Sequence, residues 1–176
     1  VSPLYLARMI KQVKSLIAAD QGQAIITSHS PAVLGRVEPA GVRYCRCSAP
    51  TRTTTVKPLQ LPTGDVEAAK FIRGAMLAFP ELYFARFVVL VEGDSERIVL
   101  PTLAEALDLL VDPSFVAIAP LGGRHVNHFW KLLTDLGIPF ATLLDLDIGR
   151  NGGGWGRLKI AMKNLLAMGV PKATLL

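Results

Sequence analysis

Apolar and polar positions follow two different periods along this chain of 176 residues, and the second half is the more regular. Short runs of almost wholly apolar residues indicate buried strands at 86–91, 115–119 and 140–145. Apolar residues at helical spacing predict helices at 95–110, 125–136 and 156–168. A last strand is expected to begin near Ala173. Strands that alternate with helices predict the α/β fold class, a parallel sheet flanked by helices.

The first half of the chain is less regular. Its predicted elements are a helix that starts at Ser2-Pro3, a buried strand at 24–27, two strands at 42–48 and 52–59, and a helix at 66–79. A capping hydroxyl before proline favours the helix start, and alternating polar and apolar positions favour the two strands. The regular series begins only near residue 85, which predicts a domain boundary there.

Carboxylates follow two of the regular strands at the point where each strand ends. Glu92 and Glu96 come after the first of these strands, and Asp145 and Asp147 come at the end of the third. Because open α/β sheets bind ligands beyond the carboxyl ends of their strands, the four acids are expected at one edge. If the third strand persists, Asp145 and Asp147 share one of its faces. Such oxygen donors suit hard divalent cations such as Mg²⁺, and hence phosphate chemistry.

Ordinary local structure is the alternative explanation for each pair of acids. Acidic residues are common at helix starts, which would account for Glu92 and Glu96. A strand-end turn before a glycine-rich loop would account for Asp145 and Asp147. Because both pairs occur in one strand-helix series in the order that a shared site needs, we favour a metal site. Asp94 is expected to cap the helix rather than to bind the metal.

Composition narrows the class of protein. Hydrophobic residues make up 51% of the chain and charged residues 19%, which indicates a globular protein with a buried core. No apolar run reaches the roughly 18 residues that a membrane helix needs, so no membrane span is expected. The two cysteines, Cys45 and Cys47, are too few for a disulfide scaffold, and a reducing cytoplasm is therefore the expected location. Residues 1–75 carry 10 Lys and Arg against 4 Asp and Glu, and this excess favours a polyanionic partner.

The string Leu90-Val-Glu92-Gly93-Asp94-Ser95-Glu96, with Asp145-Leu-Asp147 after a later strand, resembles the Toprim domain and, within it, the OLD (overcoming lysogenization defect) nucleases. The resemblance implies a Toprim-like parallel sheet and a metal-dependent DNA endonuclease, so DNA is the expected partner. It implies that Glu92 and Asp145 are catalytic. It also implies that Mg²⁺ or Mn²⁺, two ions in all, is bound by Glu92, Glu96, Asp145 and Asp147.

Two glycine-rich segments accompany these acids. Gly122, Gly123 and Arg124 precede a helix, where backbone N–H groups and an arginine can hold a phosphate. This segment resembles the glycine-rich turn beside the metal site of OLD proteins, whereas the pattern alone fits a plain turn equally well. The second segment, 151–154, predicts a mobile loop. Around it, Arg150, Trp155 and Arg157 either contact nucleic acid or belong to a simple connection with Trp155 packed on the sheet.

Ser28-His29-Ser30-Pro31 resembles the switch-histidine segment of ABC-type ATPases, and OLD proteins place such an ATPase before their Toprim domain. The resemblance implies three parts: 1–62 as the C-terminal part of an ATPase domain with a hairpin connector, 63–84 as a linker helix, and 85–176 as a Toprim domain truncated at its C-terminus. It implies that His29 senses ATP in the full-length parent, whose ATPase offers a surface for a homodimer. The chain has no Gly-x-x-x-x-Gly-Lys-Ser/Thr motif, so it is not expected to hydrolyse ATP alone.

Other interpretations use the same carboxylates. One is a different Toprim-type nucleic-acid enzyme, and another is a metal-binding module that tethers DNA without cleaving it. A receiver-like phosphoacceptor needs an acidic pair on its first strand, and a dehalogenase-like phosphatase needs Asp-x-Asp there. Here the first regular strand ends in Glu92-Gly93, and Asp-x-Asp follows the third. These two rivals are therefore less favoured than the Toprim interpretation.

Overall fold

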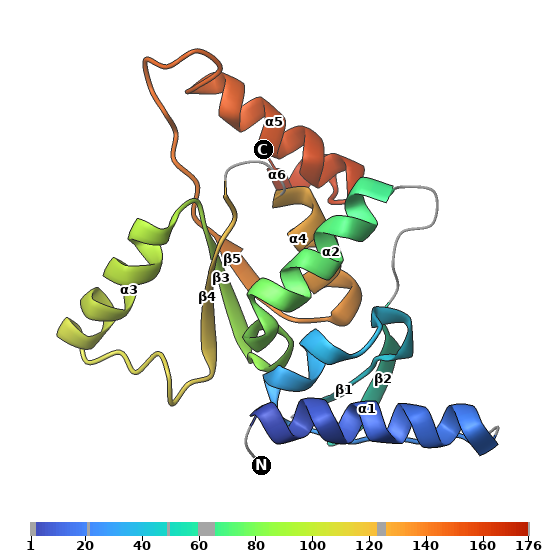
Figure 1. The fold of residues 1–176 in the computed structure, drawn as a ribbon. Coiled ribbons are helices and arrows are strands. Elements are labelled where there is room, and N and C mark those ends of the chain that lie inside the picture. The colour runs from blue at the N-terminus through green and yellow to red at the C-terminus, as the bar shows by residue number, and fades with distance from the viewer. Residues whose placement is uncertain (1–2, 21, 49, 60–65, 123–125, 176) are drawn as a thin grey trace. The chain divides into compact units, whose positions relative to one another are not determined.

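The computed structural model describes residues 3–20, 22–48, 50–59, 66–122 and 126–175. The chain divides into two compact units, Val1–Phe84 and Ala85–Leu176, which Figure 1 draws as a ribbon. Among the described residues, no helix combines the length and the apolar composition that a membrane crossing requires.

Among its described residues, the first unit contains two α-helices, three short 3₁₀ helices and one antiparallel pair of strands. These are α1 (Pro3–Asp20), η1 (Pro31–Arg36), η2 (Pro39–Gly41), β1 (Arg43–Cys47), β2 (Thr54–Pro58), α2 (Val66–Ala78) and η3 (Pro80–Phe84). Strands β1 and β2 pair with Arg43 opposite Pro58 and Cys47 opposite Thr54. The predicted helices and the predicted pair of strands are thus confirmed. That this unit is part of an ATPase domain stays a prediction.

The strand predicted at 24–27 is wrong. Residues 22–30 have no regular secondary structure, and the side chain of Ile25 is 96% exposed. A strand requires a hydrogen-bonded neighbour, and none of the strands in the described residues pairs with this segment. The apolar run therefore had the composition of a strand but lacks a partner for its backbone.

The second unit is built on a parallel sheet, as the sequence predicted. Its strands are β3 (Phe87–Val91), β4 (Val116–Pro120) and β5 (Phe140–Thr142), in the order β4-β3-β5. In the central strand, β3, the side chains of Val88, Leu90 and Val91 are completely buried, as expected for an apolar run between two neighbours. Register is fixed on both sides of β3, with Phe87 opposite Val116 and Val88 opposite Phe140.

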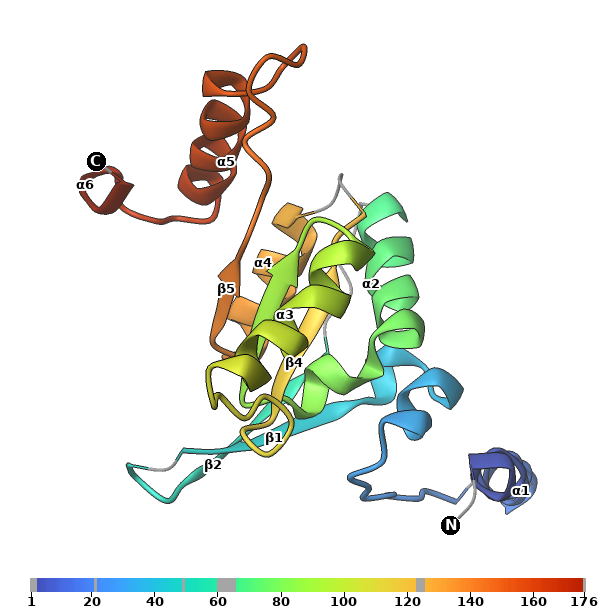
Figure 2. The ribbon, with the colours of Figure 1, turned by 90° about the vertical axis from the view of Figure 1, so that its left-hand side faces the viewer.

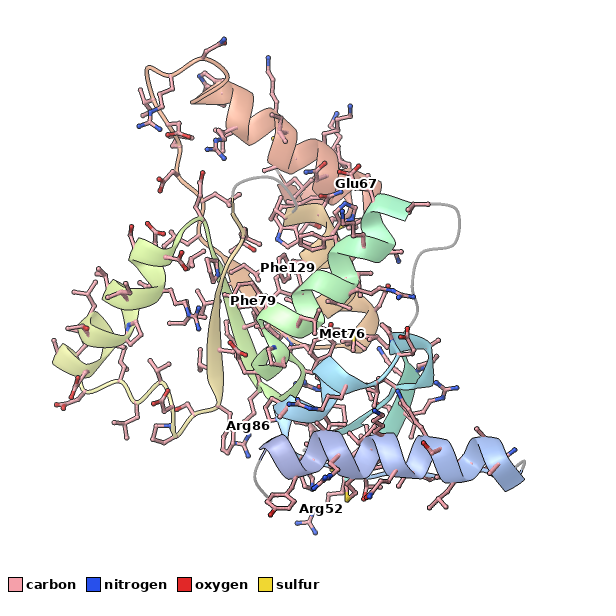
Figure 3. All side chains as sticks on the ribbon, in the orientation of Figure 1. Arg52, Glu67, Met76, Phe79, Arg86 and Phe129 are labelled. Atoms are coloured by element: carbon pink, nitrogen blue, oxygen red, sulfur yellow. The ribbon has the colours of Figure 1, made fainter. Side chains whose placement is uncertain are left out.

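Helices cover both faces of this sheet. Figures 1 and 2 show α3 (Asp94–Ala106) and α4 (Val126–Leu136) on opposite faces, as right-handed crossovers in opposite directions require. The apolar face of α4 is buried through Phe129, Trp130, Leu132, Leu133 and Leu136. The indole N–H of Trp130 also donates a 2.7 Å hydrogen bond to the hydroxyl of Thr142 on β5. Figure 3 labels Phe129 of this apolar face. It also labels Arg86, whose guanidinium makes a cation–π contact at 5.5 Å from the centroid of the Phe115 ring.

Three predictions for this unit need correction. The helix predicted at 95–110 ends earlier, at Ala106. Strand β5 ends at Thr142, so Asp145 and Asp147 lie beyond the strand and not on one of its faces. The strand predicted near Ala173 is instead a short helix, α6 (Lys172–Leu175), which follows α5 (Trp155–Ala167). Pro171 explains this difference, because its fixed φ favours a turn, and its carbonyl accepts a 2.9 Å hydrogen bond from Thr174 N–H.

Candidate metal and nucleic-acid site

The order of the strands places a topological switch point beside β3. The chain passes from β3 through α3 to β4 on one side, whereas β5 lies on the other side of β3. In an open parallel sheet, the point where connections leave in opposite directions is where ligands bind, beyond the carboxyl ends. Glu92 follows β3 directly, and Asp145 and Asp147 follow β5. The sequence-predicted acids therefore border this point.

Glu92 is held by the main chain that follows β5. The N–H of Leu143 continues the parallel pairing with a 2.8 Å hydrogen bond to the carbonyl of Leu90. Two residues later, the N–H of Asp145 donates a 2.8 Å hydrogen bond to Oε2 of Glu92. A carboxylate thus takes the position that the next backbone carbonyl would have had. This contact fixes the direction of the Glu92 side chain.

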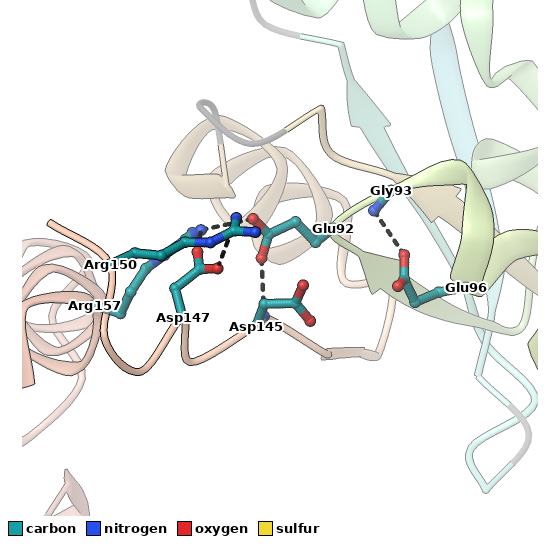
Figure 4. A network of polar contacts seen from close by, with 7 residues as sticks. All are labelled: Glu92, Gly93, Glu96, Asp145, Asp147, Arg150 and Arg157. Atoms are coloured by element: carbon teal, nitrogen blue, oxygen red, sulfur yellow. Dashed lines mark hydrogen bonds and ion pairs between the residues drawn. The ribbon is translucent and has the colours of Figure 1, made fainter. Parts of the chain in front are cut away.

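Arg157 bridges Glu92 and Asp147, as Figure 4 shows. Its Nη2 lies 2.7 Å from Oε1 of Glu92 and also donates to Oδ2 of Asp147. A second arginine, Arg150, lies 3.2 Å from the other oxygen of Asp147. The Glu92 and Asp147 side chains are only 19% and 17% exposed, so water screens the Arg157 contacts less than at an open surface. Hydrogen bonds to Asp147, and then to Glu92, raise the pKa of Arg157.

The loop between β5 and α5 brings Arg157 back to the acids. Asp147 has a φ of 50°, in the left-handed region, which turns the chain. Gly153 then passes so close that a Cβ there would lie 1.8 Å from the carbonyl oxygen of Asp147. The N–H of Gly154 closes the turn with a 2.6 Å hydrogen bond to Leu146. Arg157 is the third residue of the helix that follows, α5.

Glu96 has a different partner. Its Oε2 accepts a 2.9 Å hydrogen bond from the N–H of Gly93, the residue that caps α3. Gly93 has no side chain, so this is the backbone half of a capping box alone. The expectation that Asp94 caps the helix is wrong, because Asp94 is its first residue. In Figure 4 the Asp145 and Glu96 carboxylates lie apart from the Arg157 bridge.

The remaining predicted residues are placed as follows. Gly122 has a φ of 62°, and its N–H donates a 3.2 Å hydrogen bond to the carbonyl of Glu92, which brings this turn to the same edge. Gly123 and Arg124 lie outside the described residues. Trp155 is 78% exposed, so it does not pack on the sheet. His29 is exposed and belongs to the first unit.

The bridged position has the chemistry of a site for a hard cation. One oxygen of Glu92 and one of Asp147 contact the same cationic nitrogen, so their geometry already converges on a single positive charge. Carboxylate oxygens are the ligands that Mg²⁺ prefers. Over the described ranges, however, no three His, Cys, Asp or Glu side chains lie close enough together to hold a metal ion. Glu92 and Asp147 fit one cation, and Asp145 and Glu96 would have to turn toward it.

The pairing of Arg157 with the acids was not foreseen from the sequence, which assigned this residue to nucleic-acid contacts. The signal available was an arginine in the first turn of a helix that has no acidic residue there. A positive charge at that end of a helix is unfavourable unless an anion from elsewhere approaches it.

The fold and these acids define a Toprim-like α/β domain, and the comparisons specify its kind. Residues 83–147 match the family "Overcoming lysogenization defect protein-like, TOPRIM domain". This part of the chain is therefore similar to the Toprim domains of OLD-like proteins; Toprim domains generally bind divalent metal ions.

Solved structures give a partial match. The C-terminal region of the Burkholderia pseudomallei OLD protein is 33% identical in sequence, with a TM-score of 0.43. The match covers 48% of this chain and 42% of that one, so this chain spans less than half the length of that structure. No curated protein matches the sequence.

Proposed function

We propose that the second unit is the nuclease domain of a metal-dependent DNA endonuclease that hydrolyses phosphodiester bonds. The observation that supports this most directly is the convergence of Glu92 and Asp147 on one cationic position at the switch point of the sheet. A second support is the OLD-like Toprim family, whose members act on nucleic acids.

Different residues are proposed for metal binding, for nucleic-acid contact and for catalysis. Glu92 and Asp147 would hold Mg²⁺ or Mn²⁺, with Asp145 and Glu96 completing the ligands of two ions. Bound cations would supply charge stabilisation for the phosphate and a water of lowered pKa. Gly122, in the turn at the same edge, and Trp155, which is exposed beside the loop, would contact the nucleic acid. Glu92 and Asp145, joined by a hydrogen bond, are the proposed catalytic pair.

Cleavage of supercoiled plasmid DNA by the full-length protein tests this proposal. With Mg²⁺ or Mn²⁺ we expect nicked or linear products, and none after chelation. Glu92→Gln and Asp147→Asn remove a carboxylate charge while keeping side-chain size, and each should abolish cleavage. Glu105→Gln is the matched control, because Glu105 is an exposed acid far along α3. Metal-dependent DNA binding without any cleavage would instead favour the tethering module.

We also propose that His29 senses ATP within an ATPase domain to which the first unit contributes. The support comes from the sequence alone, from the Ser28-His29-Ser30-Pro31 string. The structure adds none, because this segment forms no strand. In full-length protein, His29→Ala should lower ATP turnover and leave cleavage without nucleotide unchanged. If His29→Ala and the parent hydrolyse ATP at the same rate, the ATP-sensing role is excluded.

A further inference from the structure

Every carboxylate oxygen of Glu92 and Asp147 already has a hydrogen-bond donor or a cationic partner. Oε1 of Glu92 and Oδ2 of Asp147 accept from Arg157 Nη2. Oε2 of Glu92 accepts from the Asp145 N–H, and Oδ1 of Asp147 is paired with Arg150. Figure 4 shows these contacts as one connected network. A cation that takes the position between these two acids must therefore replace the Arg157 nitrogen that occupies it.

Arg157 is the donor that a cation would replace. It is the group that contacts both acids, and its side chain is 30% exposed, whereas that of Arg150 is 80% exposed and contacts Asp147 alone. Two positive charges cannot share the same pair of oxygens at contact distance without strong repulsion. The backbone donor at Asp145 is neutral and occupies the other oxygen of Glu92, so it can stay.

We propose that Arg157 is an internal counter-ion of the metal-free site and that a divalent cation displaces it. This inference rests on the proposed function, because it requires that Glu92 and Asp147 bind metal. The Arg157 guanidinium neutralises both acids while the site lacks a metal. When a cation takes those oxygens, Arg157 is released at the edge of the site. A phosphate of the substrate is then an available acceptor for its N–H groups.

The surroundings of Arg157 explain why its release is feasible. None of the described side chains of α5 is buried, and α5 has no side-chain cap and no acid in its first turn. Little apolar packing thus opposes a movement of this helix. The positive end of the helix dipole also disfavours Arg157 at its third position. The contacts with Glu92 and Asp147 therefore hold the start of α5 in place, and their exchange for a cation would loosen it.

Manganese binding without DNA tests the exchange. Arg157→Gln removes the competing charge, so Mn²⁺ should bind more tightly than in the parent, on the order of 5-fold or more, as coupled ligands typically show. In chelator, the same variant should melt at a lower temperature, because the two acids lose their counter-ion. Lys163→Gln is the matched control, since it removes one positive charge from an exposed position of the same helix. It should bind Mn²⁺ like the parent.

Amide hydrogen exchange supplies a second readout. Mn²⁺ should speed exchange at the start of α5 in the parent but change it little in Arg157→Gln, where the bridge is already absent. Arg157→Lys keeps the charge but loses the planar fork, so an intermediate Mn²⁺ affinity is expected, and it replaces Arg157→Gln if that variant does not fold. Equal or weaker Mn²⁺ binding by Arg157→Gln, with normal binding by the parent, would overturn the exchange and leave the metal site intact. If the parent bound no metal, both proposals would fail.

Discussion

The backbone N–H of Asp145 donates a 2.8 Å hydrogen bond to Oε2 of Glu92, although 53 positions separate the two residues in the chain. This contact joins the segment after β5 to the end of β3 and leaves Oε1 of Glu92 to Arg157. Because the donor belongs to the main chain, the Asp145 side chain takes no part in it. Main-chain position and side-chain charge at Asp145 can therefore be tested separately.

Replacement of Asp145 by asparagine keeps the N–H and removes the charge. We expect the free energy of unfolding in chelator to change by less than about 0.5 kcal/mol, as for exposed substitutions. If the carboxylate turns toward the metal, Mn²⁺ affinity should fall about 10-fold or more. Urea denaturation and Mn²⁺ titration measure the two effects. Unchanged Mn²⁺ affinity would show that Asp145 contributes its backbone alone.

Gly153 and Gly156 form a second pair for comparison. A Cβ at Gly153 would lie 1.8 Å from the Asp147 carbonyl oxygen, whereas one at Gly156 meets nothing within 4 Å. Gly153→Ala should therefore displace the loop, lower the free energy of unfolding and weaken the bridge to Asp147. Gly156→Ala, in the first turn of α5, should stabilise by up to about 1 kcal/mol. Chemical denaturation of both variants is the measurement, and a Gly153→Ala protein as stable as the parent would contradict this account of the loop.

The sequence predicted the sheet of the second unit because its signals are local. Five consecutive apolar residues, Phe87–Val91, are typical of a strand buried between two neighbours, and the helices that follow are long enough for parallel crossovers. The same order of elements predicted that Glu92 and the acids after β5 would border one crevice. A strand predicted from composition alone can be wrong, however, because a strand also needs a neighbour to pair with. Ala24–Thr27 has the composition of a strand but pairs with none of the strands in the described ranges, and β5 stops at Thr142.

The arrangement of the site itself was less predictable. Arg157 and Glu92 are 65 positions apart, and their contact depends on a left-handed turn at Asp147 and a close passage at Gly153. Neither the left-handed φ of Asp147 nor the close approach at Gly153 follows from the spacing of apolar residues. Glu96 could be placed in the first turn of α3 from the sequence. Whether its carboxylate turns to the Gly93 N–H or toward the proposed metal position depends on side-chain rotation. Periodic patterns thus place these residues at an edge, and loop geometry decides their partners.

The hydrogen bond between Trp130 and Thr142 ties α4 to β5, the strand that leads into the site. Thr142→Val removes the acceptor and leaves the indole N–H of a buried tryptophan without it, so a loss of about 1–3 kcal/mol is expected. Trp130→Phe removes the donor, and the double variant should lose less than the sum of the two single losses. Urea denaturation of the four proteins gives this coupling. Strict additivity would show that the bond adds nothing to stability.

Tyr83 provides a pH-dependent test of the first unit. Its hydroxyl is buried and, within the described ranges, has no hydrogen-bond partner. Burial raises the pKa of Tyr83 well above its usual value near 10. The folded protein keeps the phenol neutral, while the unfolded chain ionises it once the pH passes about 10. The contribution of this group to stability is therefore fully present below pH 10 and is lost as the pH rises further.

Tyr83→Phe should remove this pH dependence. Near pH 8 the variant should be as stable as the parent or slightly more stable, because no hydrogen bond is lost and a desolvated hydroxyl is removed. Above pH 10 the parent should lose stability relative to the variant, so that the difference between their free energies of unfolding widens with pH. Tyr5→Phe, at a tyrosine that is 68% exposed, is the matched control and should show no such widening. Parallel curves for Tyr83→Phe and the parent from pH 8 to 11, measured by urea denaturation, would mean that Tyr83 ionises as easily in the folded protein as in the unfolded chain.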